Sequence, residues 1–211
     1  VPGFVLALLA LGSIEHFERV SRLLVPSEQP GAVLFADLEA STRLTRELAP
    51  SEFFELVRAF AVEADEAIVR HAGVVGKHAG DGATAFFLAS ECGSSSSAVV
   101  AAVAAVREMA VPLDAIAAAA GLPPGSVQLN AGLHWSDRMY VGDLITSGRL
   151  EATGFGEEVN VAARVQQTAD GGQVLASKAL LEHLDPEDAA ALGIDPDDRS
   201  YTPLGDLPGA D

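Results

Sequence analysis

The chain has 211 residues and carries 13 Lys plus Arg against 30 Asp plus Glu, which gives a formal net charge of −17. This excess of acid argues against a nucleic-acid-binding surface, because such a surface needs clustered cations. Hydrophobic residues make up 49% of the chain, so it can bury the core of one domain of about 150 to 200 residues plus an appendage. Cys92 is the only cysteine. A disulfide framework within the chain and a cysteine-based metal site are therefore excluded, and we expect a cytoplasmic location.

The first 30 residues predict a helical segment and linker ahead of the main domain. Residues 4–11 form an apolar run that is too short to span a bilayer, which takes about 20 residues, and it lacks the basic start of a signal peptide. The spacing of the apolar residues predicts one or two helices over residues 3–25. These helices are interpreted either as a packing appendage or as a coupling helix from an upstream regulatory domain. We place residues 1–30 in this segment and residues 31–211 in the main domain.

Two acidic residues follow apolar strand patterns. Residues 32–36 predict a short buried strand that runs into Asp37. An acid at the end of such a strand is a common place for a metal ligand, although it could also cap the next helix. Residues 73–87 predict a β-hairpin around a Gly-Asp-Gly core. Its Asp81 is interpreted either as part of a solvated turn or as a second metal ligand, with Lys77 pointing into a pocket.

The other predicted elements complete an α+β order. Helices are predicted over residues 42–72, interrupted at Pro50 with Ser51 as a cap, and over residues 98–120. Strands are predicted at residues 127–135, 139–145 and 173–176, and a last helix begins after Ser177. The strands and helices follow the order β-α-β-β-α-β, which predicts a ferredoxin-like core.

Three blocks of the sequence resemble the catalytic domain of class III nucleotidyl cyclases, the adenylate and guanylate cyclase family. They are FADLEAST at 35–42, KHAGDG at 77–82 and GEEVNVAAR at 156–164. Each block is weak alone, but all three occur in the family's order. The resemblance covers residues 31–184, and the general run of the sequence is similar to actinobacterial members. It implies the nucleotidyl cyclase fold and a homodimer.

The resemblance implies an adenylate cyclase, which converts ATP to 3′,5′-cyclic AMP and pyrophosphate. In this reaction the ribose 3′-hydroxyl attacks the α-phosphate with the help of two divalent ions, Mg²⁺ or Mn²⁺. Asp37 and Asp81 match the family's two metal-binding aspartates, and the backbone carbonyl of Leu38 matches a further ligand. Two aspartates suffice, because Mg²⁺ is usually bound by few carboxylates together with substrate phosphates.

The resemblance also implies a second group of site residues. Lys77 matches the lysine that reads adenine, since an ammonium donates to N1 of adenine but is repelled by the N1–H of guanine. Thr153 stands at the partner position for the adenine amino group, and a threonine there is linked in a subset of the family to bicarbonate stimulation. Asn160 matches the residue that orients the ribose, and Arg164 the one that stabilises charge on the phosphates. One subunit would supply the aspartates and the other these four residues.

Three positions depart from the family's pattern. No lysine follows Lys178, although the family has a transition-state lysine near the C-terminus. Ser136 stands where glycine is usual, and Thr153 replaces the commoner acid. These departures leave open a catalytically weak or inactive cyclase-like module that binds nucleotide or dimerises. A guanylate cyclase is a further alternative, against which Lys77 argues. A diguanylate cyclase is disfavoured because its Gly-Gly-acid-Glu-Phe hairpin differs from residues 79–83.

The expected partners are therefore ATP, a second copy of the chain and an upstream regulatory domain. We expect no nucleic acid and no membrane span in this chain.

Overall fold

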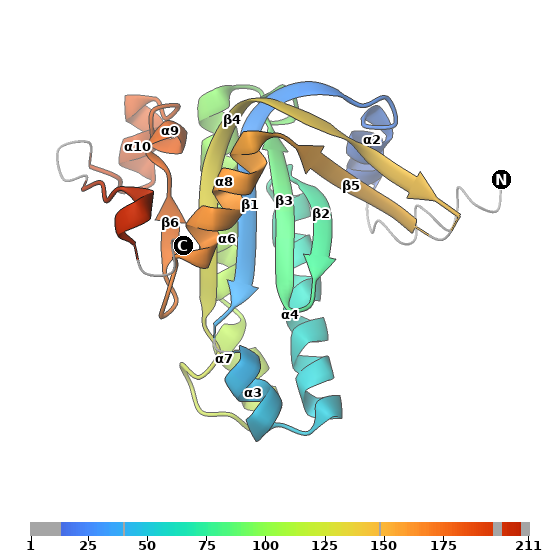
Figure 1. Ribbon diagram of the computed structural model, residues 1–211, viewed down its shortest axis with the longest axis vertical. Helices are drawn as coiled ribbons and strands as arrows, with labels where there is room; N and C mark the ends of the chain where they lie inside the picture. The colour runs from blue at the N-terminus through green and yellow to red at the C-terminus, as the bar shows by residue number, and fades with distance from the viewer. Residues whose placement is uncertain (1–13, 40, 148, 196–199, 208–211) are drawn as a thin grey trace.

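The computed structural model describes residues 14–39, 41–147, 149–195 and 200–207 (Figure 1). Six strands form one sheet in the order β2-β3-β1-β4-β5, and β6 pairs with β4. Among the described strands, the β4–β6 pairing is parallel and the other four pairings are antiparallel. The strands are β1 (Ser27–Leu38), β2 (Val74–Ala79), β3 (Gly82–Leu88), β4 (Leu129–Thr146), β5 (Arg149–Phe155) and β6 (Val174–Ala176).

The order β2-β3-β1-β4 is that of a ferredoxin-like core, as the sequence predicts, with β5 added beside β4. The described helices are α2 (Ile14–Arg22), α3 (Ser41–Glu47), α4 (Pro50–Arg70), α5 (Ala89–Cys92), α6 (Ser95–Ala110), α7 (Leu113–Ala119), α8 (Glu157–Gln167), α9 (Lys178–Leu181) and α10 (Pro186–Ala191), followed by the 3₁₀ turn η2 (Leu204–Asp206).

Strand β1 is central because its two faces serve two cores. Leu34 is fully buried in a core that also contains Phe60 of α4 and Val99 of α6. Val33, which faces the other side of the sheet, lies in a second core with residues of α8, α2 and the β4–β5 pair. Alternate residues of a strand face opposite sides. We call these two sides the α4 side and the α8 side of the sheet.

Strand β4 is one long strand, and the prediction of two strands at residues 127–135 and 139–145 is wrong. The polar residues between them do not end the strand, because β1 extends back to Ser27 and pairs with the second half of β4. Arg138 makes an ion pair with Glu28 across this extension, with a shortest N–O distance of 3.0 Å. Pro30 lies at the β4 bulge between the Gln29 and Gly31 pairs, where a proline is tolerated.

Two helix predictions also need correction. The helix predicted over residues 98–120 is two helices, since Pro112 lies between α6 and α7 and cannot donate a helical N–H. Ser51 does not cap α4. The cap position is Ala49, whose N–H donates to the Glu52 carboxylate at 2.8 Å. The predicted Ser177 cap is confirmed, because its hydroxyl accepts a hydrogen bond from the N–H of Leu180.

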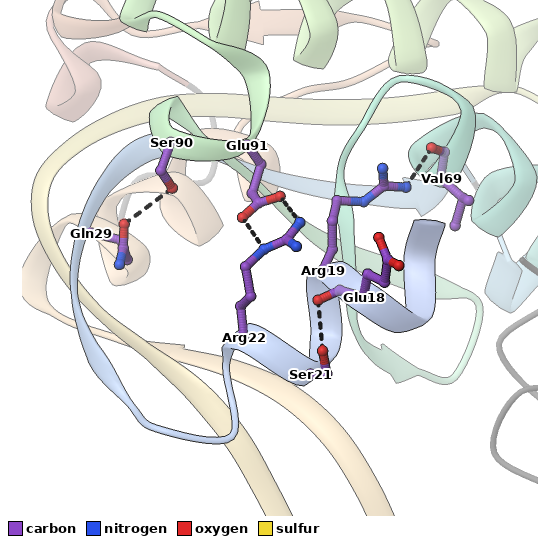
Figure 2. A network of polar contacts seen from close by, with 8 residues as sticks. All are labelled: Glu18, Arg19, Ser21, Arg22, Gln29, Val69, Ser90 and Glu91. Atoms are coloured by element: carbon purple, nitrogen blue, oxygen red, sulfur yellow. Dashed lines mark hydrogen bonds and ion pairs between the residues drawn. The ribbon is translucent and has the colours of Figure 1, made fainter. Parts of the chain in front are cut away.

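Helix α2 confirms part of the predicted N-terminal helical segment, whose residues 3–13 lie outside the described residues. Val20 and Leu23 are buried in the α8-side core. Two arginines fasten the helix (Figure 2): Arg22 pairs with Glu91 through two hydrogen bonds, and Arg19 donates to the carbonyl of Val69 at 2.9 Å. Helix α2 is thus packed on the domain. None of the described helices is long and apolar enough to cross a membrane.

Candidate active site

The structure brings Asp37 and Asp81 together at one end of the sheet. Asp37 is the second-last residue of β1, and Asp81 lies in the two-residue turn that joins β2 to β3. The hairpin prediction is confirmed, and Gly80 in the turn has a φ of +68°, which glycine adopts without strain. A Cβ atom at Gly82 would lie 3.3 Å from Asp37 Oδ1. The glycine therefore lets the turn approach the end of β1 closely.

The two carboxylates repel one another in this position. Burial raises the pKa of Asp37 to about 6, and the neighbouring Asp81 carboxylate contributes to the same shift. Asp81 Oδ2 is buried and has no hydrogen-bond partner within the described part of the chain. A buried oxygen without a donor beside a second carboxylate is the environment that a divalent cation would stabilise. The donor set therefore fits Mg²⁺ or Mn²⁺, which prefer oxygen ligands.

The aspartates would need further ligands from elsewhere. No group of three or more His, Cys, Asp or Glu side chains that could hold a metal occurs in the described residues. Backbone oxygens and substrate phosphates are the usual additional ligands of Mg²⁺. The family resemblance implies the backbone carbonyl of Leu38 as such a ligand. Leu38 is the last residue of β1 and has a buried side chain. Its backbone hydrogen-bonds to the Asp37 carboxylate.

A polar network that sequence reasoning missed supports this end of β1. The Asn130 side-chain amide donates to the Glu39 carboxylate. Asn130 Oδ1 in turn accepts from the N–H groups of Gly172, at 2.9 Å, and Gln173, at 3.2 Å. Glu39 lies two residues after Asp37, so the network ties the aspartate end of β1 to the loop before β6. The presence of Glu39 in the block at residues 35–42 was the only signal in the sequence.

The second group of predicted residues makes no polar contact with the aspartates within the described part of the chain. Asn160 and Arg164 are both exposed on α8, and their spacing of four on this helix confirms that they share a face. Lys77 is exposed on β2, and Thr153 is half-buried on β5. Within the described residues, none of these four side chains makes a hydrogen bond or ion pair with Asp37 or Asp81. The chain therefore displays two separate groups of candidate site residues.

This chain was compared with a family model, with curated proteins and with solved structures. A sequence model of the Adenylate and Guanylate cyclase catalytic domain matches residues 25–199, whereas a comparison with curated proteins found no match. Among solved structures, the adenylyl cyclase CyaB from P. aeruginosa is 23% identical with a TM-score of 0.67, and covers 75% of this chain and 82% of its own. The guanylyl cyclase Cya2 is 24% identical with a TM-score of 0.66, and covers 76% of this chain and 80% of its own.

A third similar structure is a Class III adenylyl cyclase-like ATP-binding protein from Pseudomonas aeruginosa. It is 14% identical with a TM-score of 0.64, and covers 75% of this chain and 35% of its own. At these identities the structures bear on the fold alone, and they confirm the predicted nucleotidyl cyclase fold. The family match covers most of the sequence and includes both aspartates and the second group of residues. The chain belongs to the family of adenylate and guanylate cyclase catalytic domains.

Proposed function

We propose that this domain is an adenylate cyclase, which forms 3′,5′-cyclic AMP and pyrophosphate from ATP in a homodimer. The observation that carries the proposal is the contact between Asp37 and Asp81, two carboxylates held together at the end of the sheet with an unpartnered buried oxygen. In the reaction, the ribose 3′-oxygen loses its proton and bonds to the α-phosphorus. The bond from that phosphorus to the bridging oxygen breaks, and pyrophosphate leaves.

The aspartate end of the sheet would hold the metal ions. Asp37, Asp81 and the carbonyl of Leu38 would bind two Mg²⁺ or Mn²⁺ ions, which stabilise the attacking oxygen and the phosphate charge of an in-line displacement. The network of Glu39 and Asn130 keeps β1 in place beneath them. The protein's contribution at this end would therefore be to hold two carboxylates close together, where a bound cation would offset their repulsion.

Lys77 and Thr153 would select the base. Lys77 makes no hydrogen bond or ion pair in the described part of the chain, so its ammonium is free to donate to N1 of adenine. The Thr153 hydroxyl can accept from the adenine amino group. Guanine carries an N1–H at the position that faces Lys77, so a donor would meet a donor there, whereas its carbonyl could accept from the Thr153 hydroxyl. This complementarity favours ATP over GTP.

Asn160 and Arg164 would act on a nucleotide bound to the aspartates of a second copy. Both are exposed on α8 and contact neither aspartate within the described residues. On the neighbouring β4–β5 pair, Tyr140 and Phe155 lie opposite one another with 50% and 63% of their surfaces exposed. An exposed aromatic pair is typical of a protein interface. A two-fold dimer would complete two equivalent sites.

The test is to incubate the purified protein with Mn²⁺ and either ATP or GTP, and to identify cyclic product by mass spectrometry. A parallel sample with EDTA controls for the metal, and calorimetry measures ATP binding. We expect cyclic AMP from ATP, little cyclic GMP from GTP and no product with EDTA. Cyclic GMP as the main product would make the domain a guanylate cyclase. ATP binding without product would favour the inactive module, and neither binding nor product would overturn the proposal.

A further inference from the structure

Strand β2 carries a bulge at the position of Lys77. Val75 pairs with Ala85 and His78 pairs with Ala83, so β2 takes three steps where β3 takes two. Gly76 and Lys77 therefore lie opposite the single residue Thr84. A bulge of this kind changes the direction in which the following side chains face.

The bulge reverses the facing of β2. Before it, Val74 lies in the α8-side core and Val75 packs against the α4-side core. Regular alternation would put Lys77 on the α4 side, with Val75, and His78 on the α8 side. His78 instead contacts Asp65 of α4, with 2.8 Å between His78 Nε2 and Asp65 Oδ1. Lys77, its neighbour in the strand, is thereby left to face the α8 side.

The α8 side is where the strand that carries the other proposed base-binding residue packs against the sheet. Strand β5, which carries Thr153, contacts β2. A Cβ atom at Gly154 of β5 would lie 2.6 Å from the Phe86 ring, and Phe86 belongs to the α8-side core. The facing of Lys77 that follows from the bulge is thus the one that brings it to the side of the sheet against which Ala152 and Gly154 of β5 pack. Thr153, which alternates with them, faces the other side of β5.

The backbone ladder does not hold the bulge. Among the described strands, β2 is the outer strand of the sheet and forms its hydrogen-bonded ladder with β3, and this ladder is interrupted between Val75 and His78. Gly76 permits the bulge, since a Cβ there would lie 3.0 Å from the Thr84 carbonyl oxygen. The anchor beyond the bulge is the His78–Asp65 contact. Asp65 is suited to this task because α4 is fixed by buried residues on either side, such as Ala64 and Ile68.

We propose that Asp65 is a positioning residue for base selection: by holding His78 on the α4 side, it keeps the bulge in place and directs Lys77 to the base. The inference rests on the proposed function, in which Lys77 reads adenine. Asp65 touches neither the nucleotide nor the aspartate pair in this scheme. Its contact with His78 is partly exposed, with 43% and 33% of the two side chains accessible. An exposed pair contributes little to stability, so stability and selectivity are separate readouts.

The test compares steady-state kinetics with ATP and GTP for the wild-type dimer, Asp65→Ala and Asp65→Asn. The control is Glu63→Ala, which removes a carboxylate from an exposed position of the same helix. We expect Asp65→Ala to raise the KM for ATP and to lower the ratio of kcat/KM for ATP over GTP by about tenfold, since a misplacement of about 1 Å can cost about a hundredfold. Asp65→Asn keeps an oxygen that accepts from His78 and should restore most of the ratio. Melting temperature and the Mn²⁺ dependence should match those of Glu63→Ala.

A second measurement follows the strand without relying on activity. Hydrogen exchange of the backbone amides in β2 should be faster in Asp65→Ala than in Glu63→Ala. Unchanged exchange, or an active wild type whose selectivity Asp65→Ala does not alter, would overturn the positioning role and leave the proposed function standing. A wild type that forms no cyclic nucleotide would overturn the proposed function, and the positioning role with it.

Discussion

The aspartate end of the sheet and the surface formed by α8 and β5 differ in how complete each is within one chain. At the aspartate end, Asp37 and Asp81 are partly buried and already in contact. On α8, Asn160 and Arg164 are exposed and reach no other predicted site residue within the described part. Under the proposed function, this difference means that one chain would preform the metal-binding half of the site, whereas the nucleotide-orienting half would need a second copy opposite it.

Removing one aspartate should have the largest effect on this comparison. Asp81→Ala should lower kcat by about a thousandfold or more, because metal ions at such a site stabilise transition-state charge by several kcal/mol. The variant should remain a dimer, since Asp81 lies in the hairpin turn and is not part of the exposed aromatic pair of the proposed interface. Assay of cyclic product in Mn²⁺, with sedimentation of the same sample, checks both parts. A variant that still makes cyclic nucleotide would show that the metal assignment is wrong.

Reversing the charge of Lys77 should change the selectivity for the base and leave metal binding unchanged. Lys77→Glu should lower kcat/KM for ATP by about 10- to 100-fold, since a hydrogen bond to a charged group contributes about 1.5 to 3 kcal/mol. It should also weaken the preference for ATP over GTP. The matched control is Lys178→Glu, which changes the only other lysine. Unchanged selectivity in Lys77→Glu would remove this residue from the base pocket.

The exposed aromatic pair offers a smaller change on the second side of the comparison. Phe155→Ala should raise the dissociation constant of the dimer by about tenfold, because truncating a well-placed aromatic side chain at an interface costs about 1 to 2 kcal/mol of binding free energy. Phe54→Ala provides the control, since Phe54 is 64% exposed on α4 and lies outside the proposed interface. Sedimentation at several concentrations measures both. Equal dissociation constants for the two variants would place the interface elsewhere.

The smallest expected effect is on stability at the aspartate end. The pKa of Asp37, raised to about 6 in the folded chain, means that the folded state binds its proton more tightly than the unfolded state does. The destabilisation is absent below about pH 4, grows as the pH rises through about 6, and is complete above it. Without metal at pH 7, Asp37→Asn should therefore be more stable than wild type by about 1 to 2 kcal/mol, allowing for solvent screening.

Two further observations check this stability effect. The difference in unfolding free energy between wild type and Asp37→Asn should shrink as the pH falls from 7 to 4.5. Mn²⁺ should raise the melting temperature of wild type more than that of the variant. A variant that is less stable than wild type at pH 7 without metal would contradict the repulsion between the carboxylates.

The sequence predicts best those features that depend on neighbours along the chain. The hairpin around Asp81 follows from turn chemistry, and Asp37 follows from an acid placed directly after an apolar strand. Strand β5 was missed although residues 149–153 alternate between polar and apolar side chains, and Thr153 on it was found only through the family resemblance. The whole length of β4 depends on its pairing with the start of β1, where Glu28 and Arg138 are 110 positions apart in the sequence.

Features that depend on pairing between strands could not be predicted from the sequence. The bulge at Lys77 arises because β2 has one more residue than β3 between the same two pairs. The sequence of neither strand shows this alone. The His78–Asp65 contact joins a strand to a helix, and no spacing rule links them. The break at Pro112 was visible in the sequence, because proline interrupts a helix, but the alanine-rich pattern on both sides outweighed it.

Complementation between two inactive variants tests the central claim most directly. Asp81→Ala and Arg164→Ala chains with different affinity tags would be coexpressed, and the heterodimer isolated through both tags. If each site takes its aspartates from one chain and Arg164 from the other, the heterodimer has one intact site and one doubly defective site. It should show about half of wild-type activity per dimer, while both homodimers stay inactive. A heterodimer as inactive as its parents would contradict a site shared between two copies.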